Sequence, residues 1–289
     1  MSFADIVKSV SSRPETVLEG RFCAWLEGLS GVSEGRELGF HPSGLYYLCP
    51  REHVLRTLLP LHDDIDASKR AKFDIGHAMH RWYQERYLGP MGVLKGRWRC
   101  SACGRNEDGF MPKAACGCRK CNGDCGEWPE SVGKVCQLCH GKRSSWEFVE
   151  TRLVDKELGV VGRCDGILSV GGDDYVLDLK TIDPDGFVGL RGAYDSHKYQ
   201  VNVYMMLTGI DKGMVLYIDK SARGGRPVKE FLVARDTGVD ADVRRKVDTV
   251  RAALAAKVVP ACSKGRWCRC AEFSDADVAA AVERWRGGV

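Results

Sequence analysis

The sequence lacks the features that mark membrane-spanning and secreted proteins. None of its apolar runs approaches the roughly twenty residues of a membrane-spanning helix. Its N-terminus has no basic stretch followed by an apolar one, as a signal peptide would have. The pattern G-x-x-x-x-G-K-[ST] is also missing, which excludes the P-loop ATPases. We therefore expect a cytoplasmic protein in a reducing compartment, without a membrane partner.

Strong net charge is missing too, but cysteine is abundant. The 289 residues carry a formal net charge of +4, which permits binding to nucleic acid without requiring it. This length suits one large domain, or a core with an insertion. The chain has 14 cysteines. Without a secretion signal, so many cysteines indicate metal binding rather than disulfides.

The stretch 162–204 places acidic residues inside apolar runs. Two runs rich in Val, Ile and Leu flank a Gly-Gly-Asp-Asp turn, which predicts a hairpin. The first run contains Asp165 and the second contains Asp178, with Lys180 two residues later on the same strand face. Burying these charges together is costly unless a divalent cation balances them. Carboxylates favour Mg²⁺ or Mn²⁺.

Two predicted helices carry further polar residues. The apolar spacing over 67–88 predicts a helix that includes His80. A second helix is predicted over 197–207, where Gln200 and Tyr204 are four residues apart and share one face. A structural histidine and a core tyrosine are the plain alternatives for residues of this kind.

The order of these motifs resembles the PD-(D/E)XK nuclease superfamily, in particular its RecB-like exonuclease branch. That branch has the motifs Gly-x-x-x-His, Gly-x-x-Asp, (D/E)-x-Lys and Gln-x-x-x-Tyr. The matching residues are Gly76 to His80, Gly162 to Asp165, Asp178 to Lys180, and Gln200 to Tyr204. The resemblance implies an α/β fold with a mixed central sheet flanked by helices, and metal-dependent hydrolysis of phosphodiesters.

The resemblance also assigns the metal ligands. His80, Asp165 and Asp178 would hold Mg²⁺ or Mn²⁺, and the carbonyl of Leu179 would be a further ligand. Glu150 is another candidate, because many members of the superfamily have an acidic residue near the metal on the strand before Gly-x-x-Asp. The alternative for Glu150 is an exposed charge on a strand.

The remaining motif residues would act on the nucleic acid. Lys180 would orient or help to deprotonate the attacking water and stabilise the transition state, and Gln200 and Tyr204 would position the strand. The branch implies a DNA exonuclease acting on single strands or ends, in recombination, repair or phage DNA processing. A helicase or recombination protein would be a separate partner. The alternatives are a structure-specific endonuclease and a non-catalytic DNA-binding or scaffold protein.

A second resemblance concerns cysteines near the two ends of this core. The run S-x-x-x-x-x-C-P-R at Cys49 resembles the iron–sulfur members of the branch, such as the AddB-type and CRISPR-adaptation nucleases. In those proteins one such cysteine and three later ones hold a [4Fe–4S] cluster; the partners here would be Cys262, Cys268 and Cys270. The spacing C-x5-C-x-C departs from the family, so zinc in the same site stays an alternative.

The range 96–145 predicts a zinc-binding insertion. Its eight cysteines, which include two C-x2-C pairs, fit two zinc ions, and metal would supply the folding energy. A nested pairing and a cross-braced pairing both remain open. In the nested pairing the outer ligands are Cys100, Cys103, Cys136 and Cys139, and the inner ones are Cys116, Cys118, Cys121 and Cys125. The basic residues of this insertion would guide DNA, or the insertion would be a rigid cap without DNA contacts or a surface for docking a partner.

These interpretations predict three regions. Residues 1–40 would form N-terminal helices without chemistry of their own. The nuclease core would comprise 41–95 and 146–289, and the insertion would separate its two parts.

Overall fold

The computed structural model divides the chain into two compact units. The first comprises Met1–Glu37 and His62–His77, and the second comprises Leu38–Leu61 and Ala78–Val289. In the first unit the described residues belong mainly to the beginning of helix α5 (Ala67–Tyr83). The described residues are Arg21, Trp25, 39–59, 66–101, 104–112, 146–221, 227–262 and 268–287. None of the described helices combines the length and the apolarity that crossing a bilayer requires.

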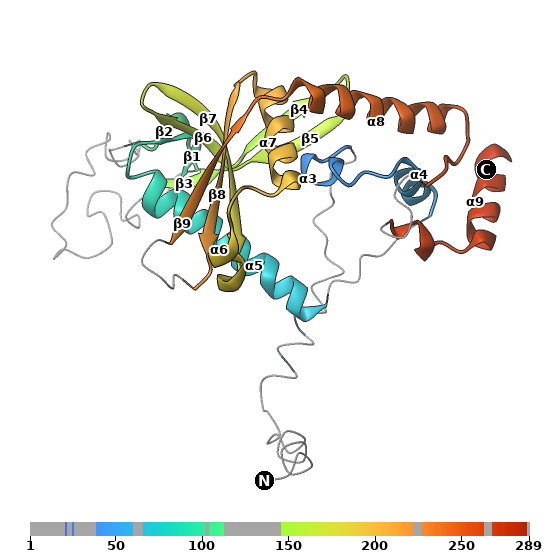
Figure 1. The fold of residues 1–289 in the computed structure, drawn as a ribbon, viewed down its shortest axis with the longest axis horizontal. Helices are drawn as coiled ribbons and strands as arrows, with labels where there is room; N and C mark the ends of the chain where they lie inside the picture. Colours follow the sequence, from blue (N-terminus) through green and yellow to red (C-terminus); the bar gives the residue numbers. More distant parts are fainter. Residues whose placement is uncertain are drawn as a thin grey trace, which may run out of the picture. The chain divides into compact units, whose positions relative to one another are not determined.

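The second unit contains the strands and most of the helices (Figure 1). Its strands are β1 (Leu94–Cys100), β2 (Asn106–Phe110), β3 (Trp146–Val149), β4 (Thr151–Asp155), β5 (Val160–Cys164), β6 (Gly166–Val170), β7 (Asp173–Ile182), β8 (Lys212–Asp219) and β9 (Val228–Ala234). Its helices are α3 (Pro42–Leu45), α4 (Pro50–Leu58), the end of α5, the π-helix η2 (Gln84–Leu88), α6 (Pro184–Gly189), α7 (Asp195–Thr208), α8 (Thr237–Ala255), the 3-10 helix η4 (Arg269–Glu272) and α9 (Asp275–Gly287).

A seven-stranded mixed sheet organises the second unit. The strand order is β2-β1-β6-β7-β8-β9, and β3 also pairs with β1. Strands β7 and β8 are parallel, and the other pairs of this sheet are antiparallel. A parallel pair needs a crossover, which α6 and α7 provide. The predicted α/β fold with a mixed central sheet flanked by helices is confirmed.

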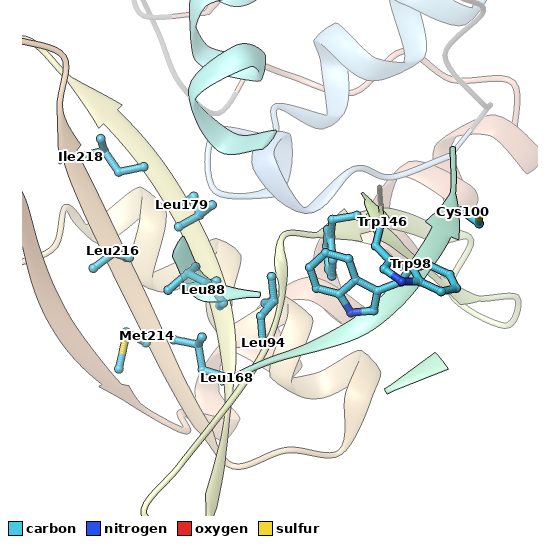
Figure 2. Packing of buried hydrophobic residues seen from close by; sticks show 12 residues of the cluster. Leu88, Leu94, Trp98, Cys100, Trp146, Leu168, Leu179, Met214, Leu216 and Ile218 are labelled. Atoms are coloured by element: carbon cyan, nitrogen blue, oxygen red, sulfur yellow. The ribbon is translucent and has the colours of Figure 1, made fainter. Parts of the chain in front are cut away.

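Side-chain alternation along β7 separates the two faces of this sheet. Leu177 and Leu179 join one apolar cluster with Trp98 of β1 and Leu88 of η2. Figure 2 shows Leu88 packed among Leu94, Leu168 and Leu179. On the other face, Val176 packs with side chains of α6 and α7. The even-numbered Asp178 and Lys180 therefore lie on the face that α7 covers.

Helices α3, α4, α7 and α8 build a further apolar cluster beside the sheet. Its buried members include Leu45, Val54, Val203 and Val247. Lys246 of α8 is also buried, and its ammonium donates a hydrogen bond to the carbonyl of Leu45, 2.8 Å away. This contact fixes the short helix α3 against α8, close to the chain segment that carries Cys49.

The first part of the predicted zinc insertion belongs to the sheet. Strand β2 and most of β1 fall inside the range 96–145, and the two strands pair over five residues from Lys95–Phe110 to Arg99–Asn106. Trp98 of β1 is fully buried and packs edge-on against Phe148 of β3, with ring centroids 5.0 Å apart. Residues 113–145 lie outside the described residues.

Candidate metal-dependent active site

Two of the predicted metal ligands occupy breaks between strands. The sequence pattern predicts one continuous strand around Asp165 and another around Glu150. The structure instead ends β5 before Asp165 and begins β6 after it, and Glu150 separates β3 from β4. Strands β4 and β5 form a separate two-stranded sheet, whereas β3 and β6 belong to the main sheet. Each acidic residue therefore lies where the chain passes from one sheet to the other.

Gly166 makes the turn after Asp165 possible. Its φ is +140°, a backbone conformation that residues with a side chain rarely adopt. A Cβ at this position would lie 2.5 Å from Leu94 Cδ1. The apolar spacing alone did not predict this break, because it shows which face a residue occupies but not where a strand changes its partner.

Asp165 lies at the centre of a group of three potential ligands. One oxygen or nitrogen of each of His80, Glu150 and Asp165 lies within 4.8 Å of the others. Asp165 Oδ1 lies 3.2 Å from His80 Nδ1, and Asp165 Oδ2 accepts a hydrogen bond of 2.6 Å from the amide of Leu179. The amide and carbonyl of one strand residue point to the same side, so the carbonyl of Leu179 points to the same edge of β7 as this amide.

The protonation behaviour of this group follows from burial and mutual charge. Burial raises the pKa of Glu150, and the neighbouring charge of Asp165 raises it further. Burial alone would lower the pKa of His80, but the hydrogen bond to Asp165 and its charge outweigh burial, so this pKa is raised. The pKa of Glu150 is thus raised mainly by burial, and that of His80 by its contact with the Asp165 carboxylate.

Asp178 and Lys180 form a buried pair next to this group. Both oxygens of Asp178 lie 2.8 Å from Lys180 Nζ, but only Oδ1 receives a hydrogen bond. Asp178 is 1% exposed, and burial raises its pKa to about 6 although Lys180 opposes the shift. Its buried Oδ2 receives no hydrogen bond from the described residues.

The donor set fits a hard divalent cation. Carboxylate oxygens and an imidazole nitrogen are common ligands of Mn²⁺, and carboxylates bind Mg²⁺. Asp178 Oδ2 is buried without a hydrogen bond, and its carboxylate stands beside the charge of Asp165, which contributes to the raised pKa of Asp178. A cation would offset these costs, because it favours the ionised forms of the two neighbouring carboxylates.

Gln200 and Tyr204 lie on the face of α7 that looks toward Asp178. Gln200 Nε2 donates a hydrogen bond of 3.1 Å to the hydroxyl of Tyr204, and both residues are buried. Burial and the charge of Asp178 hold the pKa of Tyr204 well above its usual range. Gly162 lets this ring approach β5, because a Cβ there would lie 3.0 Å from Tyr204 Cε1.

Two further polar residues near the site were not assigned a role from the sequence. Gln84 donates a hydrogen bond to the main-chain carbonyl of Asp165, and its spacing of four residues from His80 was the only signal. His197 lies on α7 with Nδ1 2.7 Å from the hydroxyl of Tyr217, a contact without a signal in the sequence.

The four cysteines predicted to hold a cluster come together. The Sγ atom of Cys49 lies 3.9 Å from that of Cys262 and 3.8 Å from that of Cys270. The Sγ atoms of Cys268 and Cys270 are 3.0 Å apart. All four sulfurs lie within 4.8 Å of one another. Burial raises the pKa of Cys268 and raises that of Cys270 to about 12. Four converging thiols of this kind can bind a metal as thiolates.

The sulfur separations bear on the kind of metal. A single tetrahedral zinc with Zn–S bonds of about 2.3 Å needs sulfurs about 3.8 Å apart. In a [4Fe–4S] cluster each thiolate binds a different iron, so that the sulfurs must lie further apart. The distances from Cys49 to Cys262 and to Cys270 match that of a single ion, whereas the 3.0 Å between Cys268 and Cys270 would have to widen for either kind of metal.

Most of the predicted zinc ligands of the insertion fall outside the described residues. These are Cys103, Cys116, Cys118, Cys121, Cys125, Cys136 and Cys139. Cys100 is described: it is the last residue of β1, it is buried, and it belongs to the apolar cluster around Trp98.

Comparisons with known proteins place the chain in a family. The model of the PD-(D/E)XK nuclease superfamily matches residues 44–273. No curated protein matches the chain.

Similar solved structures include an alkaline exonuclease (LHK-Exo) from Laribacter hongkongensis, with 12% identity, a TM-score of 0.45, and coverage of 82% of this chain and 93% of that one. SSO0001 has 14% identity, a TM-score of 0.41, and coverage of 82% and 87%. A phage-related exonuclease from Haemophilus somnus 129PT has 11% identity, a TM-score of 0.34, and coverage of 78% and 96%. Because the family model spans most of the chain, this protein belongs to the PD-(D/E)XK nuclease superfamily.

Proposed function

We propose that this nuclease is a Mg²⁺- or Mn²⁺-dependent deoxyribonuclease that degrades DNA from its ends. The observation that supports it best is the meeting of His80, Glu150 and Asp165, with ligand atoms within 4.8 Å, beside the buried pair of Asp178 and Lys180. The preference for DNA ends rests on the resemblance of the motifs to the RecB-like branch. A role in recombination, repair or phage DNA processing belongs to the same proposal.

In this proposal the side chains of the site have different roles. His80, Glu150, Asp165 and Asp178 would hold the metal, which when bound supplies an acidified water and positive charge for the scissile phosphate. Lys180 is one-fifth exposed and keeps its ammonium beside Asp178, so it can donate to the attacking water or to a phosphate oxygen.

The pair of Gln200 and Tyr204 would act on the strand. The two side chains are already hydrogen-bonded to each other, which fixes their rotamers on α7. Burial keeps Tyr204 protonated at neutral pH, because its pKa is well above the usual range. A protonated hydroxyl and an amide are suitable donors for backbone oxygens of a DNA strand.

The four-cysteine site belongs to this proposal as a structural element. Its ligands come from the start of α4 and from the segment after α8, more than 200 residues apart in the chain. A metal there would join the two ends of the nuclease core. A [4Fe–4S] cluster is proposed on the resemblance to the iron–sulfur nucleases, and zinc in the same site is the alternative.

The test is cleavage of end-labelled single-stranded and double-stranded DNA with Mg²⁺ or Mn²⁺. Asp178→Ala and Lys180→Ala should each lower the rate at least about 100-fold while DNA binding persists. Matched controls are Asp173→Ala and Lys212→Ala, an exposed pair that bonds at 2.7 Å where β7 and its neighbour β8 begin. Controls should cleave like wild type.

The products decide between the candidate activities. Mononucleotides released from one end support an exonuclease, and the position of the label gives its polarity. One defined internal cut would show a structure-specific endonuclease instead. Wild-type protein that binds DNA but cleaves no substrate with either metal would overturn the proposal and favour a DNA-binding protein with a residual centre.

A further inference from the structure

Gln84 is a buried polar side chain whose amide is used at the candidate metal site. It is 3% exposed, and its Nε2 donates a hydrogen bond of 2.8 Å to the main-chain oxygen of Asp165. Asp165 lies in the break between β5 and β6, outside the paired residues of both strands. The side-chain amide of Gln84 therefore donates the hydrogen bond that the carbonyl of Asp165 would otherwise receive from the main chain of a neighbouring strand.

One helix face holds Asp165 at two points. His80 and Gln84 are four residues apart, so their side chains leave the helix on the same side. His80 Nδ1 lies 3.2 Å from the carboxylate of Asp165, and Gln84 binds its carbonyl. With the amide of Leu179 on the second carboxylate oxygen, both the backbone and the side chain of Asp165 are fixed.

The helix changes its geometry at this residue. The α-helix α5 ends at Tyr83, and the π-helix η2 begins at Gln84. The next residue, Glu85, accepts a hydrogen bond of 3.0 Å from the amide of Phe148, two residues before Glu150. The wider turn thus directs the side chain of Gln84 to the segment that carries Asp165, and the side chain of Glu85 to the segment that carries Glu150. Such π-helical turns occur frequently at functional sites.

We propose that Gln84 is a positioning residue, which holds the main chain of Asp165 so that its carboxylate meets His80 and Glu150 at the spacing that a divalent cation needs. This inference rests on the proposed metal-dependent function. Outer partners of metal ligands typically account for 10- to 100-fold in metal affinity. Gln84 would act in this way through the carbonyl of Asp165, without touching the metal or the DNA.

The test is direct binding of Mn²⁺ to the full chain without DNA, measured by the electron paramagnetic resonance of free Mn²⁺. Gln84→Met keeps the length of the side chain but removes the donor, and it should weaken Mn²⁺ binding about 10- to 100-fold. The matched control is Arg86→Met, at an exposed position of the same π-helix, which should bind Mn²⁺ like wild type. Thermal unfolding of each variant without metal shows whether it is folded.

The outcomes separate a positioning role from a merely structural one. A folded Gln84→Met protein whose Mn²⁺ affinity stays within about 3-fold of wild type would overturn the inference. Should Gln84→Met not fold, Gln84→Glu fills the same space without an N–H donor, and the same weakening of Mn²⁺ binding is expected. If wild-type protein neither binds Mn²⁺ nor cleaves DNA, the proposed function itself fails, which is a different result from a selective effect at Gln84.

Discussion

Lys180 lies 2.8 Å from both carboxylate oxygens of Asp178, two residues earlier on β7. The pair stands on the sheet face that α7 covers, where Asp178 is almost fully buried. Even with Lys180 beside it, the pKa of Asp178 is raised to about 6. The free-energy cost of burying this carboxylate is therefore larger than the stabilisation from the ion pair. The buried charge of Asp178 is therefore a source of instability in the protein without metal.

Asp178→Asn should abolish cleavage and at the same time stabilise the protein without metal. Because the folded-state pKa is raised, the carboxyl of Asp178 favours the native state at low pH, and this contribution is lost as the pH rises through about 6. A neutral amide of the same shape avoids that loss. We expect a higher Tm than wild type at pH 7.5 in a chelator, and cleavage reduced at least about 100-fold. A lower Tm for Asp178→Asn would contradict this account.

Gly162→Ala should lower stability because the added methyl group has no room. It would lie 2.7 Å from Pro42 Cγ and 3.0 Å from Tyr204 Cε1. Overpacking of this kind costs about 1–3 kcal/mol, which the midpoint of urea unfolding would show. Gly44→Ala is the control, since a Cβ at Gly44 meets nothing within 4 Å. Equal midpoints for the two variants would refute the packing argument.

Removal of one thiol from the four-cysteine site should release its metal. We expect Cys49→Ser to lose the bound metal and to unfold at lower temperature than wild type, because the link between α4 and the segment after α8 is broken. Cys164→Ala, which removes a buried core thiol outside the site, should keep the metal. Compared with wild type, Cys49→Ser should have lost about four irons per chain if the site holds a cluster, or one zinc per chain if it holds zinc. A metal content unchanged in Cys49→Ser would exclude this site.

His197 should make stability fall as the pH is lowered from 7 to 4. Burial, and then the charge of Lys180, lower its pKa to about 4. A lowered folded-state pKa means that the unfolded chain binds the proton first, so the neutral ring contributes stability above about pH 6.5 that is lost as the pH falls toward 4. In His197→Gln this part of the pH dependence should disappear from urea unfolding measured between pH 4 and 7.5. A pH profile identical to wild type would contradict the assignment.

The sequence was sufficient to predict the elements that carry the motifs. Helical spacing located His80 on α5, and Gln200 and Tyr204 on α7, and strand alternation put Asp178 and Lys180 on one face of β7. It could not show the strand breaks at Asp165 and Glu150. Alternation reports which residues are buried, but the change of partner from one sheet to another depends on contacts between distant segments.

Contacts across long sequence separations could not be predicted from the sequence either. Gln84 and Asp165 are 81 residues apart, and their hydrogen bond depends on a π-helical turn that composition does not signal. The four cysteines could be grouped from the sequence only through their resemblance to a family, because no local spacing relates Cys49 to Cys262.

Strands β2 and β3 both pair with β1, and residues 111–145 connect them. The segment leaves after Phe110, opposite Lys95, and returns at Trp146, opposite Cys100. These anchor points are about 20 Å apart, a distance that a linker of roughly eight residues can bridge. This segment can therefore be removed, lengthened or exchanged without any change in the order in which the core strands pair. A different segment could be inserted here while the proposed metal site on the neighbouring strands stays unchanged.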